Sequence, residues 1–385
     1  MKGTTLIAAM LTALLSLPLN AAENDAKARE QFMGIIGAFN TQSFQKLVPA
    51  LDQTDLVNRV VAVRPVNSQV RETFNRQFAS IAEVGFRYSV HNEKSDNSGE
   101  LIAFEFENGL GRGVIRVKLP RHEYAYLVFD LRHDRRGRLK IVDWFDSRIG
   151  QTLTMSISEL LIALQPNKAD TRALLALPNP TDLQLFQVTE MLKAARDSQA
   201  QRFFEIYDGF DEDIKAEPVV AKLAMRFAAT GKDPDRFVKT LDTFVDVFGG
   251  DDNYAFVASN YFMQIQAYDR AFASLEQFHR NFDVQEGGIP ARLSALALAL
   301  GQFEHAERYA VEATTDEPSL ELAWWSLLRA RSGAADFDGS IEALAYLEDK
   351  FGHHLDAAKL KRDPFRAFNG LAASEAFADW RAGRQ

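Results

Sequence analysis

The spacing of apolar residues changes from a helical to a strand period within the first 165 residues. Over residues 24–50 and 67–84, apolar side chains such as Phe32, Ile36, Phe74 and Phe78 recur every three or four positions, which predicts amphipathic helices. Farther along, apolar and polar residues alternate in five short runs, which predicts strands over residues 86–90, 102–106, 115–118, 123–132 and 138–146. Asn108-Gly109 and residues 133–137 supply short turns, so these strands should form an antiparallel meander. Residues 23–165 are therefore predicted to be an α+β domain with helices on an antiparallel sheet.

This order of elements resembles the nuclear transport factor 2-like or cystatin-like superfamily, in which helices cover a strongly curved sheet to form a cone. The resemblance covers residues 23–165 and rests on the order of elements, because no motif carries it. It implies a cone-like N-terminal domain. An apolar helix that ends near Leu164 departs from the simplest form of that pattern, and it could instead lead into the segment that follows.

Beyond a linker at residues 166–180, which contains Pro166, Pro178 and Pro180, the chain shows only helical periodicity. Breaks at Gly, Pro and Asp predict helix pairs over residues 181–208, 217–248, 252–282, 287–316 and 321–351. The helical repeats are expected to extend from residue 181 to 370, with a C-terminal cap and tail at residues 371–385. The fold prediction is an α+β domain followed by an all-α helical-repeat solenoid.

Three of these pairs share one pattern with a period of about 34 residues. In the repeat at 287–320 the pattern consists of Gly301, Phe303, Ala306, Ala313 and Pro318, and its elements return in the pairs that start at 252 and 321. The pattern resembles the tetratricopeptide consensus, in which small residues at the Ala306 type of position let two helices approach closely. The resemblance implies stacked helix pairs that bind peptides along the surface lined by the first helix of each pair.

On that resemblance, six residues are candidates for peptide contact by their phase along the first helices: Asn253, Phe256, Asn260, Met263, Trp325 and Arg329. Asn can hold an extended peptide backbone, and Phe, Met and Trp supply apolar contact. An alternative interpretation places Phe256 and Trp325 in the core between repeats.

A second candidate site lies on the last two predicted strands. If the cone opens on the Trp144 face, Tyr124, Tyr126 and Asp146 would line a pocket with it. Aromatic rings beside one carboxylate suit a small ligand or a general base. The simpler interpretation is that a strand-end Asp is solvated or caps a turn.

Five basic residues gather at the predicted hairpin tip between those strands: Arg132, Arg135, Arg136, Arg138 and Lys140. Hairpin tips are commonly charged, so solvation explains the cluster. A docking tip for an acidic partner is the alternative.

The N-terminus predicts export. Met1-Lys2 is followed by an apolar run from Leu6 to Leu17 and by small and polar residues up to Glu23, which is typical of a secretory signal peptide at residues 1–22. The bacterial periplasm fits this pattern best, and secretion is left open. The chain has no Cys, which excludes disulfides, thiolate metal sites and a cysteine nucleophile.

The acidic charge of the chain limits the class of partner that it can bind. The chain carries 53 acidic and 44 basic residues, and the excess lies beyond residue 165, where roughly 24 basic residues face 35 acidic ones. An acidic surface disfavours nucleic acid, which binds positive surfaces. Basic peptides or proteins fit the charge, although an acidic balance also serves solubility alone.

The sequence shows no catalytic constellation, no metal-ligand spacing and no phosphate-binding loop, so no catalytic residue, metal or cofactor is predicted. We expect an exported, non-catalytic adaptor that binds a protein or peptide in cell-envelope assembly, with self-association left open. The alternative is a small-ligand-binding or hydrolase-like cone domain with a helical-repeat arm.

Overall fold

A computed structural model describes residues 25–384, apart from residues 64–67, 91–97, 120–123, 165–168, 170, 173–174 and 363–366. The predicted signal peptide therefore lies outside the described residues. By internal packing the chain divides into two compact units, which meet in sequence at Gly250 and Asp251. The boundary predicted at residues 166–180 stays a prediction. Each unit is described by itself.

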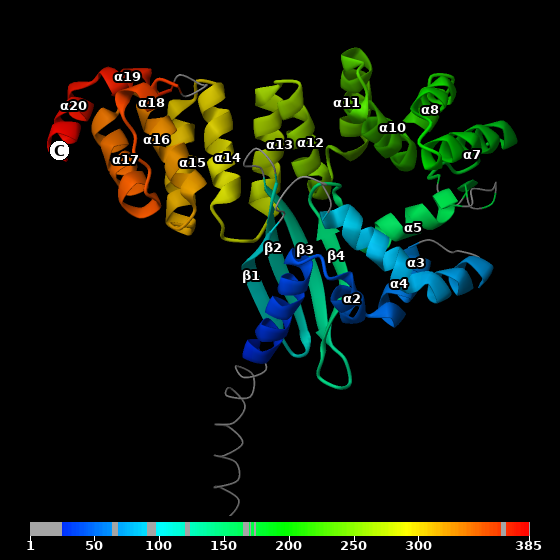
Figure 1. Ribbon diagram of the computed structural model, residues 1–385. Coiled ribbons are helices and arrows are strands. Elements are labelled where there is room, and N and C mark those ends of the chain that lie inside the picture. The colour runs from blue at the N-terminus through cyan, green and yellow to red at the C-terminus, as the bar shows by residue number, and fades with distance from the viewer. Residues whose placement is uncertain are drawn as a thin grey trace, which may run out of the picture. The chain divides into compact units, whose positions relative to one another are not determined.

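The first unit contains a five-stranded antiparallel sheet in the order β1-β2-β3-β4-β5, which confirms the predicted meander (Figure 1). Its strands are β1 (Gly99–Glu107), β2 (Leu110–Lys118), β3 (Tyr124–His133), β4 (Leu139–Asp146) and β5 (Gln151–Thr152). The turn between β1 and β2 consists of Asn108 and Gly109, with φ of 53° and 80°. A two-residue turn with two positive φ angles follows the right-handed twist of the strands, and Asn-Gly is the pair that adopts it most easily.

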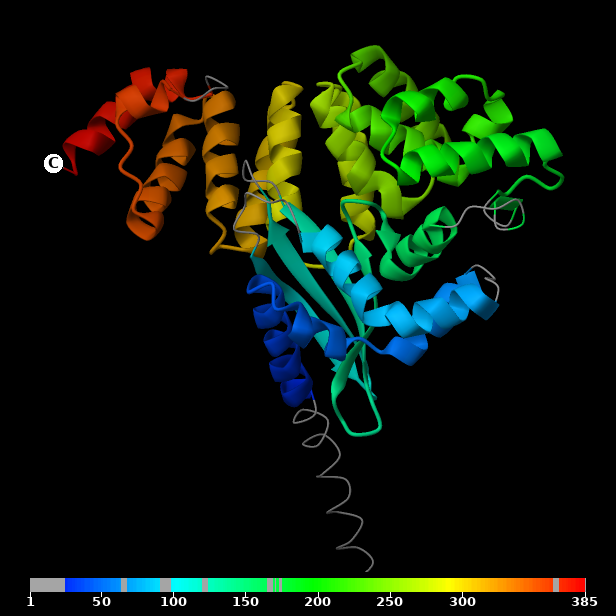
Figure 2. The same cartoon turned by 45° about the vertical axis from the view of Figure 1, so that its right-hand side comes forward.

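Helices cover one face of this sheet, as predicted. They are a helix over residues 25–40, α2 (Phe44–Leu47), the 3₁₀ turn η1 (Val48–Ala50), α3 (Gln53–Val63), α4 (Ser68–Val90) and α5 (Leu153–Leu164). Figure 2 shows the helix over residues 25–40 lying along the strands. Its Phe32 is fully buried, with ring centroids 5.6 Å from Phe104 and 5.5 Å from Phe129. Burial of one apolar stripe from each helix against one sheet face makes the core.

One predicted strand is wrong. Residues 86–90 alternate between apolar and polar, but they form the last turns of α4. Five alternating residues are too few to distinguish a strand from a helix, and no Pro or polar turn separates them from the helical stretch before them. Because adding a residue to an existing helix is easier than starting a new element, the helix continues to Val90.

Two helix pairs complete the first unit, at the places predicted from the sequence. They consist of α7 (Asp182–Arg196) with α8 (Ala200–Tyr207), then the short α9 (Glu212–Lys215), then α10 (Pro218–Thr230) with α11 (Pro234–Phe248). Thr181 and Gln184 form a reciprocal capping box at the start of α7. Upstream of it, the backbone N–H of Ala176 donates to the buried carboxylate of Glu217 across 2.6 Å.

The second unit is a row of tetratricopeptide-like helix pairs (Figure 1). The pairs are α12 (Asp252–Gln264) with α13 (Tyr268–Asn281), α14 (Gly288–Ala299) with α15 (Phe303–Asp316), and α16 (Glu321–Gly333) with α17 (Phe337–Phe351). Ala306 and Ala310 are fully buried on α15. Three short helices follow: α18 (Ala357–Leu360), α19 (Asn369–Ala373) and α20 (Glu375–Ala382).

The turns inside the pairs repeat one backbone geometry. Gln266, Gly301 and Ala335 end the first helices of the second unit, with left-handed φ of 59°, 71° and 60°. In each case the next backbone N–H donates to the carbonyl five residues earlier, which is the Schellman way to end a helix. Ser198 ends α7 in the same way, with φ of 55°. The pair at 181–208 therefore shares the turn geometry of the recognisable repeats although its sequence lacks their consensus.

Candidate functional site

The first helices of the second unit present equivalent positions at regular spacing. Asn260, Ala295 and Arg329 each precede the left-handed turn residue of their pair by six positions. Because the three turns have one geometry, these side chains occupy the same face of α12, α14 and α16. We call this surface the first-helix face; it comprises Asn260, Met263, Ala295, Ala299, Trp325 and Arg329.

Arg292 of α14 joins two of the predicted residues on α12. Its Nη2 donates to Asn260 Oδ1 across 2.7 Å and lies 3.3 Å from Met263 Sδ. Its Cζ also lies 5.1 Å from the ring centroid of Phe256. Asn260 and Met263 therefore share Arg292 as a neighbour, a residue that the sequence did not single out.

Phe256 has no exposed surface, so the alternative interpretation holds for it and it cannot contact a peptide in this structure. Its ring packs against Phe278 with centroids 5.0 Å apart, and Arg292 of the following first helix covers it. The physical reason is that this position faces the next first helix rather than solvent. Asn253, by contrast, is exposed at the start of α12, where its N–H and Nδ2 both donate to Asp251.

Between α12 and α16 the first-helix face is made of small residues. Ala295 and Ala299 are exposed and follow Arg292 by three and seven positions, which places them on its side of α14. Methyl groups at these positions leave room for a polypeptide backbone to come close to the helix.

Trp325 and Arg329 of α16 also lie together, with the Arg329 Cζ 5.8 Å from the indole centroid. The indole Nε1 donates to Glu321 across 3.0 Å, and His353 Nε2 lies 2.7 Å from the same Glu321 oxygen. Phe368 approaches both Trp325 and Arg329. Trp325 occupies the same position in its helix as Phe256 does in α12. In its repeat no further first helix follows, and a C-terminal segment (residues 355–362 and 367–384) takes that place, so Trp325 is only half-buried.

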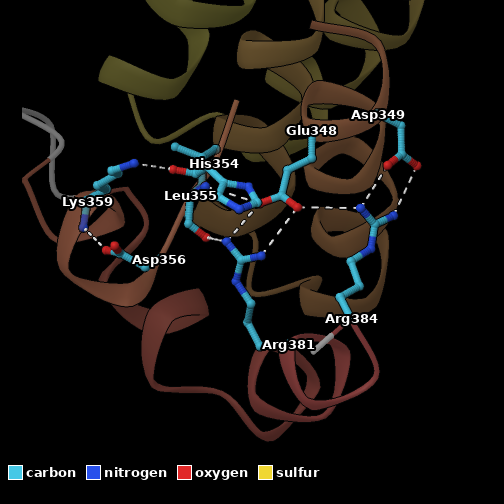
Figure 3. A network of polar contacts seen from close by, with 8 residues as sticks. All are labelled: Glu348, Asp349, His354, Leu355, Asp356, Lys359, Arg381 and Arg384. Carbon is cyan, nitrogen blue, oxygen red and sulfur yellow. Dashed lines mark hydrogen bonds and ion pairs between the residues drawn. The ribbon is translucent and has the colours of Figure 1, made fainter. Parts of the chain in front are cut away.

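A polar network holds that C-terminal segment to α17 (Figure 3). Glu348 is only 6% exposed and accepts from Arg381 at 2.7 and 3.3 Å, from Arg384 at 3.4 Å and from the Leu355 backbone N–H at 3.1 Å. Arg384 also pairs with both oxygens of Asp349, at 2.8 and 3.0 Å. These contacts tie both ends of the segment to α17, and Phe368 lies between them in sequence.

The pocket predicted on the last two strands is not formed. Trp144 pairs in register with Phe129 and lies in the core, whereas Tyr124 and Tyr126 belong to the alternate positions of β3 and face the other side of the sheet. Asp146 is 1% exposed and accepts from the backbone N–H and Nε of Arg148, both at 2.9 Å. The four residues therefore do not line one pocket, and Asp146 organises a turn.

Some basic residues of the hairpin tip form ion pairs or hydrogen bonds within the first unit. Arg132 contacts Asp52 at 2.6 Å and Asp55 at 3.2 Å, Arg138 Nε donates to Asp134 at 2.8 Å, and Lys140 donates to the Pro49 carbonyl. Arg135 and Arg136 are exposed at the tip itself. Hydrogen bonds from the backbone N–H groups of Arg138 and Arg136 lower the pKa of Asp134 to about 2 and stabilise this turn.

Among the described residues, no group of three or more His, Cys, Asp or Glu side chains is placed to hold a metal ion. Within the same part of the chain, no helix combines the length and hydropathy needed to cross a membrane.

No known family model matches the chain, and no curated protein matches it. Solved structures resemble part of it. MamA (MSR-1) has 18% identity and a TM-score of 0.32 over 44% of this chain and 94% of that chain. PilW, described as a widely conserved type IV pilus biogenesis factor, has 12% identity and a TM-score of 0.32 over 54% and 94%. YrrB, described as a TPR protein with an unusual peptide-binding site, has 15% identity and a TM-score of 0.31 over 47% and 91%. At these values the likenesses do not assign a ligand, and the tetratricopeptide-like character rests on the helix pairs and their turns.

Proposed function

We propose that the protein is a non-catalytic adaptor that binds an extended segment of a partner protein on the first-helix face. One observation supports this proposal above others. Three successive first helices present Asn260, Ala295 and Arg329 at equivalent positions, and Trp325 lies beside Arg329.

The chemistry of this face suits a polypeptide. Arg292 orients Asn260 through Oδ1, so the Nδ2 hydrogens of Asn260 can be offered to a peptide carbonyl. Exposed Ala295 and Ala299 give the backbone room, and Met263 and Trp325 supply apolar contact. Arg292 and Arg329 place two guanidinium groups at this face, so a neutral or acidic segment should bind better than a basic one.

The proposed site of action is the bacterial cell envelope. This part rests on the sequence of residues 1–22, which has the form of a cleaved signal peptide. Expression in a bacterial host, followed by N-terminal sequencing of the periplasmic fraction, should give a chain that starts near Glu23. Recovery of the uncleaved chain from the cytoplasm would contradict export without affecting the binding proposal.

Binding at the first-helix face is tested by site-specific photo-crosslinking. A benzoylphenylalanine placed at Ala295 or Ala299 should capture a defined segment of a partner, identified by mass spectrometry of the cross-linked peptide. Val311 is exposed on α15, a second helix, and is the matched control position. Equal capture of the same segment at Val311 would contradict the proposal.

A second experiment blocks the first-helix face with a bulky side chain. Ala295→Trp adds a large side chain at an exposed position and removes no contact, so the fold should be unaffected while affinity for the captured segment falls at least about tenfold. Val311→Trp should leave affinity within about twofold. Unchanged binding by Ala295→Trp would place the partner elsewhere.

A further inference from the structure

An open hollow that the sequence did not indicate lies between the helix pairs of the first unit. It has a volume of about 330 Å³ and lies between α8, the end of α10 and the start of α11. Its lining includes two aromatic rings and four charged groups: Phe204, Phe227, Glu205, Asp208, Asp233 and Arg236.

The apolar part of the hollow is aromatic and packs on a buried ring. Phe227 stacks on the fully buried Phe203, with ring centroids 4.7 Å apart, and Phe203 meets Phe204 at 5.2 Å. Phe204 and Phe227 are themselves half-buried, so part of each ring is accessible from the hollow. Aromatic faces carry partial negative charge and attract cations.

The polar part of the hollow is acidic. Glu205, Asp208 and Asp233 are all about half exposed at its edge, against one basic residue, Arg236. The carboxylates and the ring faces thus both favour a positive ligand.

Arg236 shows how these residues hold a cation. Its Cζ lies 4.4 Å from the Phe204 centroid, its Nη1 lies 2.8 Å from Asp208, and its Nε lies 3.4 Å from Asp233. Glu205 pairs with Arg202 at 3.4 Å, but both partners of that pair are more than half exposed. An exposed pair of this kind contributes little and exchanges readily with another cation.

We propose that this hollow binds a lysine or arginine side chain from a basic segment of a partner protein. The aliphatic stem lies on Phe204 and Phe227, and the charged end lies between Glu205 on α8 and Asp208, the residue that directly follows α8. This site goes beyond the peptide site proposed above. It lies on other helices and selects the opposite charge, so either proposal can fail alone.

The test uses the full chain and a fluorescein-labelled tetralysine peptide in fluorescence anisotropy at about 0.15 M salt, where long-range attraction is screened. The double variant Glu205→Gln/Asp208→Asn should weaken binding at least about tenfold. The control Asp213→Asn/Asp246→Asn removes the same charge from exposed positions outside the hollow and should change affinity less than about twofold. Equal losses in the two double variants would reduce the effect to net charge and overturn the proposal.

A third variant is expected to act in the opposite direction. Arg236→Gln removes the resident cation from Asp208 and Asp233, so tetralysine should bind several-fold more tightly. Melting temperatures of all variants establish that they are folded. Unchanged or weaker binding by a folded Arg236→Gln protein would overturn the proposal, and so would spermidine displacing the peptide at equimolar concentration, because the hollow would then be a polyamine site.

Discussion

The phenol of Tyr309 on α15 donates to Glu276 on α13 across 2.6 Å, joining two successive repeats through their second helices. Burial of the phenol, together with this bond to a carboxylate, raises the pKa of Tyr309 to about 12. Beside it, His279 and Glu312 join the same two helices at 2.7 Å. Polar contacts between repeats thus supplement the apolar core.

The Tyr309 pair makes stability depend on alkaline pH. Because the pKa of Tyr309 is higher in the folded chain than the ordinary 10, its contribution is complete below about pH 10 and is lost as the pH rises toward 12. Tyr309→Phe should lower the free energy of unfolding by about 1 kcal/mol at pH 8 and flatten the loss above pH 10. Urea unfolding at pH 8 and pH 11 measures both effects. An equally steep alkaline loss in Tyr309→Phe would contradict the assignment.

Phe256 and Asn260 should respond differently to truncation although both were predicted to contact a peptide. Phe256→Ala removes a fully buried ring and should cost about 3–5 kcal/mol of unfolding free energy. Asn260→Ala removes a partly exposed amide and should cost less than about 1 kcal/mol, while weakening peptide binding. Denaturant unfolding separates the two. A small loss for Phe256→Ala would mean that the ring is not in the core.

Close approach of α15 to its neighbours depends on the absence of a side chain beyond Cβ at Ala306. Ala306→Leu inserts three carbons into a fully buried site and should destabilise the fold by about 1–3 kcal/mol. Ala295→Leu makes the same change at an exposed position on α14 and should be close to neutral. Thermal unfolding of the two variants side by side checks the difference, and equal melting temperatures would remove the packing argument.

Arg381 should matter more than Arg384 for the C-terminal segment. Arg381→Ala leaves the buried Glu348 without its main partner and should cost about 2–3 kcal/mol, whereas Arg384→Ala loses chiefly its pair with the exposed Asp349 and should cost about 1 kcal/mol or less. Hydrogen exchange over residues 367–384 reports the loosening directly. The opposite order of the two effects would show that Asp349, rather than Glu348, anchors the segment.

Regular elements were predictable where a local pattern decides them. The Asn108-Gly109 turn determines the β1–β2 register, and the period of about 34 residues locates the helix pairs. The segment at 86–90 was not predictable, because its short alternation competes with the extension of an existing helix. Ser198 was also missed, since its turn has the repeat geometry but no Gly to mark it.

The sites depend on contacts that no local pattern reveals. Asn260 and Met263 lie on one side of α12 because they are three positions apart in the same helix. Arg292, which contacts both, lies on the next first helix, α14. Tyr126 and Trp144 fall on opposite faces because the register pairs Trp144 with Phe129, three positions from Tyr126. The acidic hollow draws its lining from α8, α10 and α11, whose approach is determined by packing.

The C-terminal segment also limits whether a second molecule can stack on the last helix pair of the second unit. α19 packs on α16 and α20 on α17, where another helix pair would otherwise stack. A bare last pair would offer its apolar side to a second molecule, and such head-to-tail addition continues without limit into a filament. With Arg381 and Arg384 joining residues 375–384 to Glu348, stacking of a second molecule on this side of α17 would first have to displace these residues.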